Sequence, residues 1–181
     1  MADVLLAEVT ITHVLDCIAD PTKIRVIAEF SNDVSPAMPY LNALIKNASY
    51  SHEAKILHFN VGHRMLTLYP RVVTMAKADD LDDAWRVLDW LKAQINEAHS
   101  RRDQIEPCYD MRPALRPLDV YALLPRENCR RCGEATCMAF AFKLLQGRAA
   151  VDGCSLLAEE RFAGHRQALS TMLGGVADRL G

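Results

Sequence analysis

The feature that most constrains this 181-residue chain is a set of four cysteines, Cys129, Cys132, Cys137 and Cys154. Two residues separate the first pair, four the second and sixteen the third. A tight loop can direct three sulfurs into one space, and a helix can then carry the backbone away and return it for a fourth ligand. This spacing is typical of an iron–sulfur site.

Two other uses of the same cysteines are alternatives. Structural zinc also takes four thiolates, but it usually draws them from two Cys-x-x-Cys knuckles, and this run holds one. A disulfide framework would need an oxidising compartment, whereas the chain has six cysteines and starts without a positively charged leader. An iron–sulfur site is the preferred prediction, with zinc as its main alternative.

The residues around the cysteines fit a charged cluster. Gly133 can adopt a positive φ, so that backbone N–H groups point at sulfur without a Cβ in the way. Thr136 can cap a helix predicted over about 137–149, whose positive end would lie beside thiolate. This helix is apolar nearly all round, which predicts that it is buried and shields the site. Gly147 and Gly153 supply bends that return the chain to its last cysteine.

The segment 117–154, PLDVYALLPRENCRRCGEATCMAFAFKLLQGRAAVDGC, resembles a known domain. It is similar to the small [4Fe-4S] domain at the start of the large subunit of corrinoid iron–sulfur proteins, and to one in the ferredoxin-like B subunit of the Rnf electron-transport complex. The features that match are Val120, Tyr121, Leu123, Leu124, Pro125, Asn128–Cys129, Cys132–Gly133, Thr136–Cys137, Ala139–Phe140–Ala141, Gly147 and Cys154.

The resemblance implies one [4Fe-4S] cluster that passes single electrons. The ligands that it implies are Cys129, Cys132, Cys137 and Cys154. The chain departs from the pattern where glycine commonly follows the first cysteine, because Arg130 and Arg131 stand there, and where proline commonly follows the last, because Ser155 stands there. The arginines either raise the reduction potential or dock an acidic partner, or they are simply a solvated loop. The resemblance covers about a quarter of the chain, so the methyl-transfer role of that family does not carry over.

Composition predicts a globular protein of the cytoplasm. Hydrophobic residues make up 50% of the chain and charged residues 24%, and the net charge is −2. No apolar stretch reaches the length of a membrane span, and the scattered arginines give no nucleic-acid footprint.

Residues 1–98 predict an antiparallel sheet covered on one side by two helices. Two stretches within 5–30 read as a hairpin turning at Asp20–Pro21. Residues 55–77 read as strand, turn, strand, with a turn at Gly62, and Pro70 either breaks the second strand or makes an edge bulge. The helices are expected from Ser35, as N-cap with Pro36 following, to about Asn47, and after the acidic run 78–83.

The sequence makes separate predictions for several residues of this first domain. In the second helix Trp85 falls on the predicted core face, and Trp90 falls off it, where it either packs in the core or meets a partner. His58 and His63 have no obvious third ligand and are not predicted to bind metal. Cys17 is predicted to be a small buried hydrophobe.

The fold class predicted is therefore α+β, with the sheet domain followed by a small, mainly helical [4Fe-4S] domain. The domains are 1–98, a polar, proline-bearing linker over 99–118, and an iron–sulfur domain over 119–181 that ends in one or two helices within 156–180. Cys108 lies in the linker and is predicted to play no part in the cluster.

The function predicted is a one-electron carrier that serves a redox protein or metalloenzyme and is not itself an enzyme. The sequence contains no phosphate-binding glycine loop and no catalytic triad pattern. A cluster-delivery or maturation factor is one alternative, and a structural metal-binding interaction module is another. Homo-oligomerisation is left open.

Overall fold

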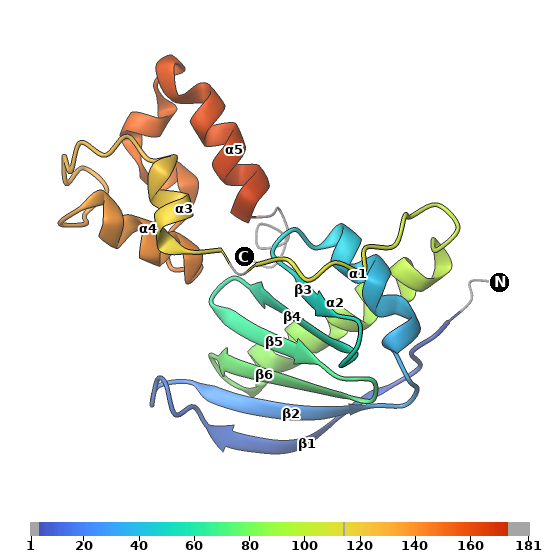
Figure 1. Ribbon diagram of the computed structural model, residues 1–181. Helices are drawn as coiled ribbons and strands as arrows, with labels where there is room; N and C mark the ends of the chain where they lie inside the picture. The colour runs from blue at the N-terminus through green and yellow to red at the C-terminus, as the bar shows by residue number, and fades with distance from the viewer. Residues whose placement is uncertain (1–3, 114, 174–181) are drawn as a thin grey trace. The chain divides into compact units, whose positions relative to one another are not determined.

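The computed structural model describes residues 4–113 and 115–173 (Figure 1). The chain divides into two compact units, residues 1–113 and 114–181. The segment 99–118, predicted as a linker, spans this division. Among the described residues, no helix is long and apolar enough to cross a membrane.

The first unit contains an antiparallel sheet, as the sequence predicts; the sheet has six strands, of which Ser49–Ser51 was not predicted. Its strand order is β1-β2-β6-β5-β4-β3, and every neighbouring pair is antiparallel. The strands are β1 (Val9–Asp16), β2 (Ile24–Phe30), β3 (Ser49–Ser51), β4 (Ile56–Val61), β5 (Arg64–Leu68) and β6 (Val72–Ala78).

The turns of this sheet lie where the sequence places them. The β1–β2 hairpin is confirmed, and Cys17, just after β1, is buried as predicted. Gly62 joins β4 to β5 with a φ of +60°, a conformation that glycine adopts without strain. Pro70, which cannot donate to a ladder, separates β5 from β6.

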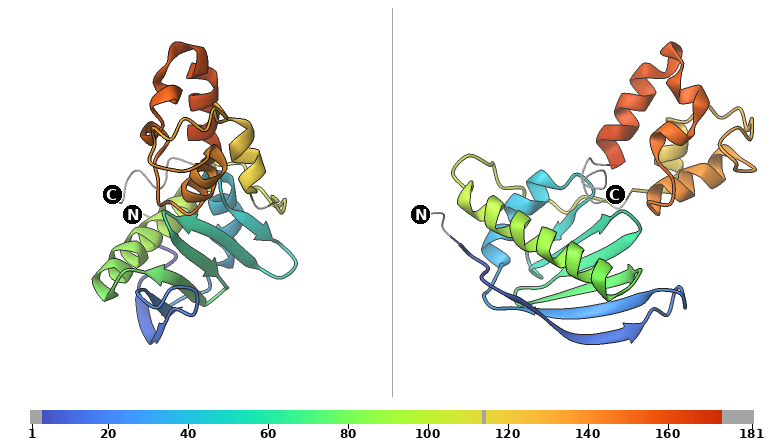
Figure 2. Two further views of the ribbon diagram at one scale, coloured as in Figure 1. Left: turned by 90° about the vertical axis from the view of Figure 1, so that its left-hand side faces the viewer. Right: turned by 180° about the vertical axis from the view of Figure 1, so that it is seen from behind.

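Two helices, α1 (Met38–Leu44) and α2 (Leu81–Ser100), cover one face of the sheet (Figure 2). Buried and partly exposed residues alternate along β4, as expected for a strand with one covered face. The core side chains of β4 are Leu57, Phe59 and Val61, and those of α2 include Val87, Leu88, Leu91 and Ile95.

Helix α2 begins as predicted, but its tryptophans exchange roles. Asp80 is the N-cap, and its Oδ1 accepts a hydrogen bond from the Asp83 N–H at 2.8 Å. The prediction that Trp85 faces the core is wrong, because its side chain is 38% exposed. Trp90 is half-buried and its ring meets that of Phe59 edge-on, with centroids 6.4 Å apart. Trp90 is therefore the tryptophan that packs.

The helix predicted from Ser35 to about Asn47 is shorter and starts differently. A 3₁₀ turn covers Ser35–Ala37 before α1, and no side chain caps either element. The Ser35 N–H instead donates to Asp33 Oδ1 at 2.8 Å. Helix α1 ends at Leu44 because Ile45 is extended, with ψ at 108°.

Residues 101–113 are bound to the first unit by hydrogen bonds. The fully buried Asn42 donates through Nδ2 to the carbonyls of Cys108 and Asp110, at 2.9 and 3.1 Å. The Ser49 hydroxyl donates to the carbonyl of Arg112 at 2.7 Å. Cys108 is half-buried in this segment, so its surroundings belong to the first unit.

One buried carboxylate joins α2 to the sheet. Asp83 is 1% exposed and receives two hydrogen bonds from the Arg64 guanidinium and one from the Asp79 N–H. Burial alone would raise the pKa of Asp83, but the hydrogen bonds from Arg64 and from that backbone N–H outweigh it and hold the pKa below its usual value. The folded unit therefore favours the charged carboxylate.

The second unit is mainly helical, as predicted. It contains α3 (Pro117–Ala122), α4 (Cys137–Leu145) and α5 (Ala163–Leu173), with three 3₁₀ turns, Val151–Gly153, Ser155–Ala158 and Glu160–Phe162. The helix predicted within 156–180 is realised as two of these turns and α5, and the part of that prediction over 174–180 lies outside the described residues. The buried hydrophobic core of the unit comprises Val120, Leu124, Cys137, Phe140, Ala141, Leu144, Cys154, Leu156, Leu157 and Leu169.

Candidate metal centre

The four cysteines predicted as ligands all lie in the second unit. Cys129 and Cys132 stand on the loop that joins α3 to α4, which is called here the cluster loop and spans residues 123–136. Cys137 is the first residue of α4, and Cys154 lies between two 3₁₀ turns. A loop, a helix start and a return segment thus supply the thiols, as the spacing predicts.

Three of these thiols belong to or border one hydrophobic core. Cys137 and Cys154 are buried in it, and Cys132 is partly buried against it. Cys129 is exposed. The set therefore has a side shielded from water and one ligand position that opens to solvent.

Asn128 ties the cluster loop to α4. Its Oδ1 accepts a hydrogen bond from the Cys137 N–H at 2.8 Å. The first cysteine follows directly after Asn128, so this bond ties the segment that carries Cys129 to the start of α4. The sequence marked the Asn128–Cys129 step only through the family resemblance and did not predict this bond.

The start of α4 is capped as predicted. The Thr136 hydroxyl oxygen accepts the Ala139 N–H at 3.1 Å. The positive end of the helix dipole lies at Cys137, the first residue of α4.

The cluster loop has an unusual backbone. Arg126, Asn128 and Arg130 have φ of +62°, +48° and +62°, in the left-handed region that residues other than glycine seldom adopt. Gly133 has φ +83°, and a Cβ built there would meet no atom within 4 Å. The positive φ at glycine confirms the prediction, whereas the strain at the two arginines has no signal in local sequence.

Helix α4 ends earlier than predicted, in a Schellman motif. The Arg148 N–H donates to the Lys143 carbonyl at 2.9 Å, and the Gly147 N–H to the Leu144 carbonyl at 3.1 Å, with φ of Gly147 at +65°. The bend predicted at this glycine is confirmed. The expectation that the whole helix is buried is wrong, because the Phe142 side chain is 48% exposed.

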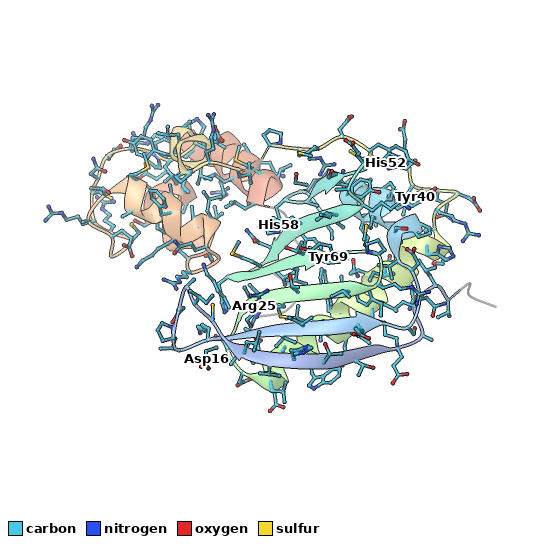
Figure 3. All side chains as sticks on the ribbon, turned by 60° about the horizontal axis from the view of Figure 1, so that its bottom comes forward. Asp16, Arg25, Tyr40, His52, His58 and Tyr69 are labelled. Atoms are coloured by element: carbon cyan, nitrogen blue, oxygen red, sulfur yellow. The ribbon has the colours of Figure 1, made fainter. Side chains whose placement is uncertain are left out.

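The donor set fits an iron–sulfur cluster by its chemistry. All six cysteines are free thiols, and soft thiolates are the ligands that such clusters take. The structure does not gather these thiols into one ligand set, because within residues 4–113 and 115–173 no three His, Cys, Asp or Glu side chains, the four predicted cysteine ligands included, are grouped closely enough to hold one metal ion. His58 lies on the sheet of the first unit (Figure 3), where its Nδ1 is 3.0 Å from Thr67 Oγ1, and His63 Nε2 lies 3.3 Å from Asp79 Oδ1.

Comparison with known proteins identifies the same segment. Residues 124–156 match the protein family described as "Putative Fe-S cluster". The acetyl-CoA decarbonylase/synthase complex subunit gamma of Methanocaldococcus jannaschii is 39% identical over 56 residues, which are 31% of this chain and 12% of that protein. The corresponding subunit of Methanosarcina acetivorans is 50% identical over 48 residues, 26% of this chain and 10% of that protein. The corrinoid/iron-sulfur protein large subunit of Moorella thermoacetica is 43% identical over 42 residues, 23% of this chain and 9% of that protein.

The segment is therefore similar to the family described as "Putative Fe-S cluster" and to parts of these subunits, and the predicted resemblance to the corrinoid iron–sulfur large subunit is confirmed. The chain spans about an eighth of the length of the first of these relatives. No solved structure matches the chain. The likeness therefore concerns the cluster region and carries no information on the sheet of the first unit.

Proposed function

We propose that the chain carries one [4Fe-4S] cluster on Cys129, Cys132, Cys137 and Cys154 and works as a one-electron carrier. The observation that supports this most is that the residues of the matched Fe-S domain include four free thiols, of which two are buried in one core and a third borders it. When bound, such a cluster supplies the reversible uptake and release of a single electron.

The chain's own residues would hold and shield that group. Leu144, Leu156 and Phe140 line the core beside the buried thiols and keep water from them, which tunes the potential of a bound cluster. The capped start of α4 places the positive end of its dipole at one of the proposed ligands, Cys137. The exposed Cys129 gives a partner close access to the site.

The reaction proposed changes no covalent bond in a substrate. The protein accepts one electron from a reduced redox protein, which is oxidised by losing it, and then gives that electron to an oxidised acceptor, which is reduced. Two of the relatives bear names that place them in the acetyl-CoA decarbonylase/synthase complex, which supports a metalloenzyme as the acceptor for this chain. In this role the chain is an accessory protein of the cytoplasm and not an enzyme.

Anaerobic EPR before and after reduction tests this function. A paramagnetic signal that appears with dithionite and disappears on reoxidation, over several cycles, is expected for a carrier. A metal centre that never changes its redox state would favour the structural module. A cluster that moves to an added apo-protein faster than it exchanges electrons would favour the delivery factor.

A further inference from the structure

We propose that three arginines of the cluster loop, Arg126, Arg130 and Arg131, form a docking surface for a redox protein with an acidic face. This proposal rests on the proposed function, because it names the class of partner with which the cluster would exchange electrons. The name arginine triad is used here for these three residues. They lie within six residues of sequence and flank Cys129, the exposed thiol of the set.

The arginine triad is free to meet a partner. All three side chains are exposed, and among the residues that the structure describes none of the three guanidinium groups is in an ion pair. The nearby acids are already engaged: Glu134 with Lys143, and Glu127 with Arg161. Among the described residues of the unit, the positive charge of the arginine triad is therefore not neutralised by an ion pair.

The backbone conformation at Arg130 indicates that this arginine has a role beyond occupying an exposed position. Its φ of +62° is one that glycine adopts without strain, and an arginine there brings a steric penalty. The exposed side chain makes no ion pair among the described residues that would compensate. What the arginine adds at this position is a positive charge directly beside an exposed cluster ligand.

Charge beside this thiol has a physical use in electron exchange. Four thiolates give a bound cluster a net negative charge, so an acidic partner would be repelled as it approached. Three guanidinium groups around the exposed ligand reverse that local repulsion and attract an acidic face. Such steering raises association rates by about 10- to 1000-fold and weakens as salt is added.

The test uses the cluster-loaded full chain and a strongly acidic ferredoxin as the probe. The triple variant Arg126→Ser/Arg130→Ser/Arg131→Ser is compared with Lys46→Ser/Arg71→Ser/Arg101→Ser, which removes the same charge from exposed positions of the first unit. Affinity is measured between the two oxidised proteins, and electron transfer from reduced ferredoxin by rapid mixing. At low salt the loop variant is expected to bind ferredoxin at least about tenfold more weakly and to accept electrons from it at least about tenfold more slowly. Both its affinity and its rate should also change less as salt is added. The control variant is expected to retain most of the affinity and most of the electron-transfer rate.

Reduction by photoreduced deazariboflavin, an uncharged small reductant, distinguishes docking of a partner from an effect of the arginines on the reduction potential. If the loop variant loses rate equally with this reductant, the arginines act on the potential and the docking proposal is overturned. The proposal would also be overturned if the control variant lost as much affinity and electron-transfer rate as the loop variant, or if the loop variant lost neither. Arginine-dependent binding of single-stranded DNA in place of ferredoxin would overturn it as well. Reversible reduction by deazariboflavin would leave the proposed electron-carrier function standing in each case.

Discussion

Replacing Asn128 by alanine should loosen the cluster loop by an amount that follows from two features. The hydrogen bond from the Cys137 N–H to Asn128 Oδ1, 2.8 Å long, is lost, at about 1 kcal/mol. Alanine at φ +48° adds roughly 1–2 kcal/mol of steric strain that asparagine tolerates better. The sum of about 2–3 kcal/mol corresponds to a loop that opens roughly 30- to 150-fold more often.

The assay is the rate at which a chelator removes iron from the anaerobic, loaded protein. Asn128→Gly keeps the backbone conformation and loses only the hydrogen bond, so its rate should rise about fivefold. Asn128→Asp keeps an acceptor and tolerates the left-handed conformation, so it should remain close to the native rate. Equal rates for the alanine and glycine variants, or an alanine variant no faster than the aspartate variant, would refute the reasoning.

Three further predictions concern other parts of the chain. Asp83→Asn should destabilise the first unit by about 3 kcal/mol at neutral pH, measured by tryptophan fluorescence in urea, because Arg64 loses its buried partner. Because folding lowers the pKa of Asp83 from 3.8, the stability that its charge contributes is present above that value and is lost as the pH falls through the lower, folded-state pKa. The loss of stability at acid pH should therefore be smaller in the variant. Arg130→Gly should slow iron loss, through relief of about 1 kcal/mol of strain, while it weakens ferredoxin binding. Cys17→Ala/Cys108→Ser should leave the iron content unchanged in a chemical assay, since both thiols lie in the first unit.

The fold of the first unit was predictable where local signals agree with tertiary packing. Alternating apolar residues, the turn at Gly62 and the break at Pro70 each predict the sheet correctly. The start of α1 was not predicted correctly, because Ser35, expected to be the cap, is the first residue of a 3₁₀ turn that precedes the helix. The exposure of Trp85 was also missed, since a periodic stripe does not show how much of it the sheet can cover.

The candidate centre likewise has features that the sequence predicts and features that it does not. The cap at Thr136 and the left-handed glycines at 133 and 147 follow from residue type, and sequence predicts them. The bond from Asn128 to the third cysteine joins residues nine positions apart, and the left-handed backbone at two arginines runs against their usual preference. Both depend on how the loop closes on α4, which local sequence does not encode.

The most direct test of the central claim is the metal and sulfide content of the anaerobically purified chain. The proposal predicts about four irons and four sulfides per chain and no zinc, with a marked loss of both when any one of the four cysteines is replaced by serine. The cysteines to be replaced are Cys129, Cys132, Cys137 and Cys154. About one zinc per chain and no sulfide would contradict it and would make the same four thiolates a structural zinc site.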